Sequence, residues 1–149
     1  MAWGRNDFRQ LGTGSNAPDR HPIPVEVVGL QGVKAIAAGC WHSMALLEDG
    51  TVWTWGYNDS GQLGDGTYNT SNKPTEVSNL TGTGVKAIAA GGWHAVALLQ
   101  DGSVWTWGRN QYGQLGDGTN TNRNRPGKVV NVTGIKVIDA GAVVSFAFG

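Results

Sequence analysis

Two stretches of the chain are almost identical: residues 33–55 read VKAIAAGCWHSMALLEDGTVWTW, and residues 85–107 read VKAIAAGGWHAVALLQDGSVWTW. A third copy of this block, IKVIDAGAVVSFAFG, starts at Ile135. A glycine-rich block recurs in the same frame: WGRNDFRQLGTG from Trp3, WGYNDSGQLGDGT from Trp55 and WGRNQYGQLGDGT from Trp107. The three tryptophans are spaced by 52 residues. A repeat of this length indicates a propeller or a solenoid.

Each repeat contains four short apolar runs separated by turn residues. We expect strands over residues 33–38, 43–47, 51–55 and 74–77, and over residues 24–28 in the first repeat. The Asp-Gly pairs between the second and third runs are a strong hairpin signal, because both turn positions favour a positive φ. The runs are apolar at consecutive positions, as expected of sheets covered on both faces. The sequence therefore predicts an all-β fold, a β-propeller of four-stranded antiparallel blades with the first strand innermost. A β-solenoid is the rival, but its repeats are usually shorter.

We expect residues 1–149 to form a single repeat domain of about three blades. Residues 33–84 and 85–134 each supply one blade, while residues 135–149 and 1–32 supply the N-terminal and C-terminal halves of a split blade. Each half exposes a strand edge and an apolar face, which favours association.

Three blades would need wedges too wide for sheets that pack about 10 Å apart. Two chains would instead supply six blades, so we expect a homodimer that closes a six-bladed ring. A nine-bladed trimer is the alternative. The residues expected at the junction between chains are Met1, Ala2, Trp3, Ser145, Phe146 and Phe148.

The composition restricts the classes of partner and the cellular compartment that we expect. Lys plus Arg equals Asp plus Glu at 11 each, which argues against nucleic acid or an anionic membrane as the main partner. Cys40 is the only cysteine, so no disulfide can form within the chain. No apolar stretch approaches 18 residues. A soluble, reducing compartment, the cytoplasm by default, is expected.

The repeat also carries a family pattern: Val-x-x-Ile-Ala-Ala-Gly-x-x-His-Ser-x-Ala-Leu, then Asp-Gly-x-Val-x-x-Trp-Gly-x-Asn, then Gly-Gln-Leu-Gly. This resembles the regulator-of-chromosome-condensation repeat family, whose members usually carry about seven blades. The family includes a nucleotide-exchange factor for a small GTPase, a plant ultraviolet receptor and a bacterial β-lactamase inhibitor. The resemblance implies a protein-binding scaffold, with a GTPase regulator or an enzyme inhibitor as alternatives.

Neither the histidines nor the acidic residues form a catalytic pattern. His42 and His94 recur at matching turns, which favours a repeated structural hydrogen bond near the channel. Ser43 follows His42 on a strand and faces the other way, so the two cannot share a proton. Asp65 lacks the successive carboxylates of a calcium loop. We therefore expect no catalytic residue, no cofactor and no metal; an enzyme with a site in the channel is the least favoured reading.

The tryptophans fall into two groups. Those in or beside the third strand should pack between blades, whereas Trp41 and Trp93 lie at turns where a partner could reach them. Alternate turns of an antiparallel sheet emerge on one side, so the same face should carry the loops that follow the third strand. The predicted partner-binding residues are Trp41, Trp93, Tyr57, Asp59, Arg109, Tyr112, Arg5 and Phe8, and they include the types that dominate binding hot spots. The Arg that follows the Trp in the photoreceptor members is missing here, so light sensing is not expected.

Overall fold

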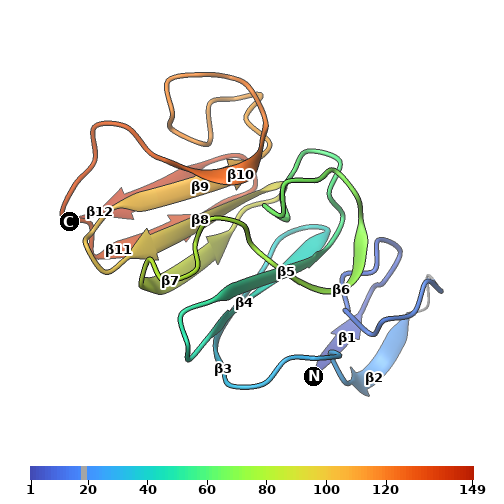
Figure 1. Ribbon diagram of the computed structural model, residues 1–149. Helices are drawn as coiled ribbons and strands as arrows, with labels where there is room; N and C mark the ends of the chain where they lie inside the picture. Colours follow the sequence, from blue (N-terminus) through green and yellow to red (C-terminus); the bar gives the residue numbers. More distant parts are fainter. Residues whose placement is uncertain (18–19) are drawn as a thin grey trace.

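The computed structural model describes residues 1–17 and 20–149, which form strands and no helices (Figure 1). Among these residues there is accordingly no helix that could cross a membrane. The strands are β1 (Ala2–Gly4), β2 (His21–Val25), β3 (Val33–Ala38), β4 (His42–Leu47), β5 (Val52–Gly56), β6 (Ser71–Glu76), β7 (Val85–Ala90), β8 (His94–Leu99), β9 (Val104–Gly108), β10 (Arg123–Lys128), β11 (Val137–Ala140) and β12 (Ser145–Phe148).

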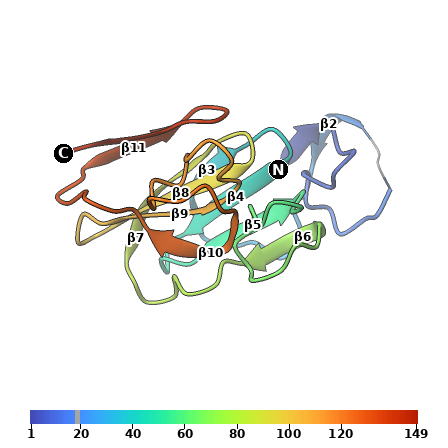
Figure 2. The same cartoon turned by 90° about the horizontal axis from the view of Figure 1, so that it is seen from above.

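The strands form four antiparallel sheets in chain order. β3–β6 make a four-stranded sheet, the first blade, and β7–β10 make another, the second blade. Two-stranded sheets flank them: β1–β2, the leading half-blade, and β11–β12, the trailing half-blade. The half-blades lie at opposite ends of the row (Figures 1 and 2). The strand β7 packs beside both β3 and β11, so the first strand of each blade is innermost, as predicted.

The fourth strand of the first repeat differs from the prediction. It runs over His21–Val25 rather than residues 24–28 and includes Pro22 and Pro24. Proline lacks a backbone donor, yet it is tolerated on an edge strand whose outer side pairs with nothing. β6 and β10 occupy the same outermost position and each contains a proline, Pro74 and Pro126. The prolines therefore belong inside the outer strands and do not precede them.

The Asp-Gly hairpins are present, but their turns are wider than the sequence suggests. Leu47 N donates to Thr51 O at 2.9 Å, and Gly50 has φ 85° while Asp49 is not among the residues with positive φ. The Asp49 carboxylate accepts hydrogen bonds from Thr51 N and Oγ1 at 2.9 and 2.7 Å. Asp49 thus shapes the turn through its side chain, and only the glycine adopts the left-handed conformation.

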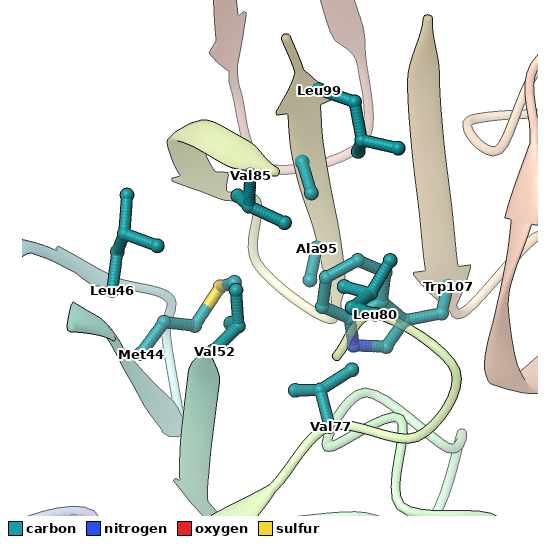
Figure 3. Packing of buried hydrophobic residues seen from close by; sticks show 10 residues of the cluster. Met44, Leu46, Val52, Val77, Leu80, Val85, Ala95, Leu99 and Trp107 are labelled. Carbon is teal, nitrogen blue, oxygen red and sulfur yellow. The ribbon is translucent and has the colours of Figure 1, made fainter. Parts of the chain in front are cut away.

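Two apolar clusters join neighbouring sheets. One lies between the two whole blades, where Met44 and Val52 of the first blade point towards the second blade (Figure 3). The other lies between the second blade and β11, where Val96 and Leu98 pack with Ile135. On each second strand, successive side chains thus face opposite neighbours, which explains why these runs are apolar throughout.

Candidate functional site

The predicted partner-binding residues gather in two groups on the loop side of the blades. In the first group, the Arg5 guanidinium lies 4.5 Å from the centroid of the Trp41 ring. Phe8 fills the space between Trp41 and Tyr57, with ring centroids 5.0 and 4.6 Å away. Tyr57 Oη donates to Asp59 at 2.8 Å, and this hydrogen bond raises the pKa of the tyrosine. The leading half-blade and the first blade therefore build one aromatic cluster.

The second group also pairs an arginine with a tryptophan, but Arg109 comes from the same blade as Trp93, whereas Arg5 comes from the repeat before Trp41. The Arg109 guanidinium lies 5.4 Å from the Trp93 ring centroid, and Ser60 replaces Phe8 in the repeat. A polar hollow of about 790 Å³ opens beside Trp93 and Arg109. Tyr112, three residues after Arg109 in the same loop, is 63% exposed. Trp41 and Trp93 themselves are half-buried beneath the arginines, so a partner would meet the arginines as well as the indoles.

A main-chain contact fixes both groups in place. Tyr57 N donates to Trp41 O, and Arg109 N donates to Trp93 O, each at 2.9 Å. A Cβ at Gly56 or Gly108, one residue earlier, would lie 2.5 or 2.6 Å from the same carbonyl oxygens. Glycine is therefore required where the third strand passes the tryptophan turn.

His42 and His94 are buried directly after the turns that carry Trp41 and Trp93, and their hydrogen-bond partners differ. Burial lowers the pKa of His42 to about 4, with a smaller contribution from the charge of His94, and burial lowers the pKa of His94 to about 4. His94 Nε2 lies 2.9 Å from Ser145 Oγ, which donates to Gln114 O at 2.8 Å. His94 Nε2 is therefore the donor in its contact with Ser145.

The expected repeated hydrogen bond is absent at His42. Among the described residues neither of its ring nitrogens has a hydrogen-bond partner. The reason lies in the next repeat, where Ala95 occupies the position that Ser145 occupies beside His94. The bond thus depends on a residue of the following blade and not on the histidine alone.

The carboxylates serve turns. Asp65 Oδ1 accepts from Thr67 N at 2.9 Å and from Thr67 Oγ1 at 2.8 Å. Asp49 accepts the matching hydrogen bond from the Thr51 hydroxyl, and this bond lowers the pKa of Asp49. In the part of the chain that the structure describes, no three His, Cys, Asp or Glu side chains are grouped so that they could hold a metal ion. The arrangement offers contact surface rather than a cluster of reactive groups.

The predicted junction residues lie at the two ends of the row. Met1 and Trp3 are 75% and 64% exposed at one end, and Phe146 and Phe148 are 44% and 61% exposed at the other. Trp3 therefore does not pack between blades as expected of third-strand tryptophans, whereas its repeat equivalents Trp55 and Trp107 are buried. Ala2 and Ser145 are half-buried beside them.

Two exposed residues at the leading end escaped the sequence prediction. Ile36 is 79% and Val33 is 44% exposed, whereas their repeat equivalents Ile88 and Val85 pack in the cluster between the whole blades. Ile36 and Val33 line a groove of about 670 Å³ together with Met1, Trp3 and Met44. Aligning the repeats sets Val33 and Ile36 at the positions of Val85 and Ile88, and this signal could have identified both residues.

Adjacent four-stranded sheets with their first strands side by side define a β-propeller segment. The family model of the Regulator of chromosome condensation (RCC1) repeat matches residues 2–46, 49–98 and 101–148. The chain therefore belongs to the RCC1 repeat family.

The chain is similar to parts of larger relatives. It is 39% identical to human E3 ubiquitin-protein ligase HERC2 and 36% identical to Ultraviolet-B receptor UVR8 of Arabidopsis thaliana, in each case over 91% of this chain. It spans only 3% and 31% of the lengths of those two proteins. Among solved structures, human WBSCR16 superposes with a TM-score of 0.87 at 26% identity, over 100% of this chain and 41% of the other. The structure of Kap60 bound to yeast RCC1 (Prp20) contains a chain that superposes with a TM-score of 0.80 at 29% identity, over 99% of this chain and 37% of the other.

Proposed function

We propose that the chain is a non-catalytic propeller scaffold, in which two copies close a six-bladed ring by completing each other's split blades and present loop faces to other proteins. The observation that carries the proposal is the complementarity of the two half-blades. β1–β2 supply a third and a fourth strand, and β11–β12 supply a first and a second strand. Joined between copies, they contain the four strands of one blade.

The exposed side chains support the same pairing. Phe146 and Phe148 occupy the positions of Met44 and Leu46, which are 1% and 0% exposed. The alternate residue Ser145 contacts the second blade through Gln114, so both phenylalanines face away from their own chain's blades. In the proposed ring they enter the groove beside Ile36 of the other copy. Burying large apolar side chains of this kind stabilises association by roughly 1.5–3 kcal/mol each.

Light scattering on the purified chain tests the ring. We expect a mass of 31.4 kDa, twice the 15.7 kDa of one chain. Deleting residues 1–6 removes β1, and this variant should remain monomeric. A folded monomer of the intact chain would refute the ring, and a mass of 47.1 kDa, three times that of one chain, would replace the dimer by a trimer.

Protein binding by the loop face is the second part of the proposal. It is favoured by the Arg5–Trp41 and Arg109–Trp93 pairs, because Trp, Tyr and Arg dominate protein-binding hot spots. The similar yeast RCC1 (Prp20) was crystallised with Kap60, and Prp20p was studied for its binding to Gsp1p and histones. Regulation of a small GTPase, or inhibition of an enzyme, is the alternative that uses this same face.

A pair of substitutions tests the face against any partner once that partner is identified. Trp41→Ala with Trp93→Ala should weaken binding at least 30-fold, since hot-spot truncations cost about 2 kcal/mol or more. Ile23→Ala, which changes an exposed residue of β2, is the control and should leave binding unchanged. If the double variant binds every identified partner as the unchanged chain does, the face is not the binding surface.

A further inference from the structure

A tryptophan contact between neighbouring repeats occurs twice within the chain. Trp55 Nε1 donates to Gln10 O at 2.8 Å, and Trp107 Nε1 donates to Gln62 O at 3.0 Å. The two indoles are 5% and 0% exposed. In both cases the last tryptophan of a third strand reaches back to the glycine-rich loop of the preceding repeat. This contact links each blade to the one before it.

A glycine two residues after the glutamine makes room for the indole. A Cβ on Gly12 would lie 2.7 Å from Trp55 Nε1, and a Cβ on Gly64 would lie 2.6 Å from Trp107 Nε1. Both distances are too short for a real Cβ, and both glycines are buried. The Gln-Leu-Gly segment is thus a seat for a tryptophan of the following repeat.

The third copy of this seat lies beside the trailing half-blade. Gln114 O accepts a hydrogen bond from Ser145 Oγ at 2.8 Å, just as Gln10 O accepts one from Ser43 Oγ at 2.8 Å. Among the described residues no indole donates to Gln114 O, and Gly116 is exposed. Gln114, Gly116 and Ser145 line a cavity of about 360 Å³ here, together with apolar side chains such as Val129. The seat therefore has the same hydroxyl contact as its first copy.

The matching tryptophan is Trp3 of β1, the strand at the opposite end of the row (Figure 1). Trp3 is 64% exposed, whereas Trp55 and Trp107 are buried, and the neighbouring Gly4 differs from its repeat equivalents in a similar way. Within the described residues nothing lies within 4 Å of a Cβ on Gly4, whereas a Cβ on Gly56 or Gly108 would meet the backbone of the tryptophan turn that leads into the second strand of the same blade. Among the described residues, the segment Trp3-Gly4 therefore lacks the packing that its equivalents Trp55-Gly56 and Trp107-Gly108 have.

The strand register brings these two parts together across two copies. Ser43 pairs with Trp55 between β4 and β5, and Ser145 and Trp3 are the equivalents of these residues. Pairing β1 of a second copy with β12 in this register sets its Trp3 opposite Ser145. The indole then lies over Gly116, as Trp55 lies over Gly12.

We propose that Trp3 of a second copy of this chain is held in the Gln114–Gly116 seat, with its indole N–H donating to Gln114 O. The inference rests on the proposed ring and names the residues that decide which strand completes the split blade. In a two-fold dimer the contact occurs twice, because each copy contributes one Trp3 and one seat. The seat is specific for an indole N–H, since a ring without this donor leaves the second hydrogen bond of Gln114 O unmade.

Sedimentation equilibrium on three variants tests the seat. Trp3→Phe should raise the dimer dissociation constant by about 30-fold, because each dimer loses two hydrogen bonds. Gly116→Ala should weaken the dimer at least as much, because its Cβ would meet the indole. A Cβ on Gly116 would also lie 3.0 Å from Val129 Cγ1 of its own chain, so the matched control is Gly84→Ala, where φ is 71° and the Cβ would lie 3.0 Å from Gln100 Cγ. This control should dimerise like the unchanged chain.

Mixing two variants shows whether the residues face each other. Trp3→Ala and Gly116→Ala should each dimerise poorly alone. Their mixture should form heterodimers, because one of the two contacts is then intact: the second variant's Trp3 meets the first variant's Gly116. A mixture that associates no better than either variant overturns the inference.

The Trp3 indole proton gives a readout that does not depend on variant stability. Its NMR signal, identified by its loss in Trp3→Phe, should exchange slowly with solvent in the dimer and fast on dilution. Fast exchange in a proven dimer, or an unchanged dissociation constant for Trp3→Phe, overturns the seat while the ring stands. A monomeric wild-type chain overturns the ring and the seat together.

Discussion

Equivalent positions of the repeat occur both at the contact between the two whole blades and at the two ends of the row. They are buried at the contact and exposed at the ends. Leu46 and Leu98 are 0% exposed in the whole blades, whereas their equivalent Phe148 is 61% exposed in the trailing half-blade. Val85 is 3% exposed, whereas Val33, at the leading end, is 44% exposed. The repeat thus encodes a sheet, but a neighbouring repeat must supply the cover. Such an array is stabilised by its nearest-neighbour interfaces as well as by its individual units.

The largest effect is expected at the tryptophan between the whole blades. Trp107→Ala should lower the free energy of unfolding by about 3–5 kcal/mol, because a large buried side chain is lost and a cavity remains. Trp3→Ala is the matched control, because Trp3 is exposed in a single chain. Urea unfolding at concentrations where the chain is monomeric should show less than about 0.5 kcal/mol for that variant, as for most surface substitutions. Equal losses would remove the distinction between the interior contact and the ends.

The buried histidines should make the whole blades sensitive to acid. The pKa of His42 and of His94 is about 4 in the folded chain against 6.5 in the unfolded chain, so the unfolded state binds more protons between these values. Stability therefore falls as the pH drops from 6.5 towards 4 and levels off below 4. From pH 7 to pH 5 we expect a loss of about 2 kcal/mol for each histidine, measured by urea unfolding.

Histidine substitutions test whether His42 and His94 cause this pH dependence of stability. His42→Gln combined with His94→Gln should remove most of it, while His21→Gln, on the leading half-blade, should leave it in place. If the double variant keeps the full loss between pH 7 and pH 5, other groups carry the acid sensitivity.

A smaller, stabilising change is expected at the contact that one blade lacks. Ala95→Ser would place a hydroxyl beside His42, as Ser145 is placed beside His94, and should raise the free energy of unfolding by about 1 kcal/mol. Ala97→Ser, two residues later and equally buried, offers no such partner and should destabilise the chain. Thermal unfolding of the two variants at pH 7 checks the difference in sign. A fall in stability for Ala95→Ser would show that the turn has no room for the hydroxyl.

Local features of the fold were predictable from the sequence. The first strand over Val33–Ala38 was predicted with its observed bounds, because a lysine and small apolar residues are followed at once by Gly39. The bounds of β2 were wrong, because proline breaks most strands and edge position is a property of the whole sheet.

The candidate sites depended on contacts between repeats. Which residues gather at the loop face could be inferred from matching turns, but the position of Phe8 between Trp41 and Tyr57 requires residues of two sheets. The missing partner of His42 is likewise set by Ala95, a whole repeat away. A single repeat does not contain this information.

A cross-link placed by strand register tests the central claim, that the two ends complete each other between copies. Met44 pairs with Thr54 in the first blade, and the equivalents are Phe146 of one copy and Ala2 of the other. A Cys40→Ser chain carrying Ala2→Cys and Phe146→Cys should therefore oxidise to a covalent dimer that reverts on reduction, since directly opposite Cα atoms of antiparallel strands lie about 4.5–5.5 Å apart, within the range that a disulfide spans. Moving the second cysteine by one residue, with Ala147→Cys, turns it to the other face and should abolish the cross-link. A chain that stays monomeric with the first pair, or that cross-links equally with both, would contradict the account.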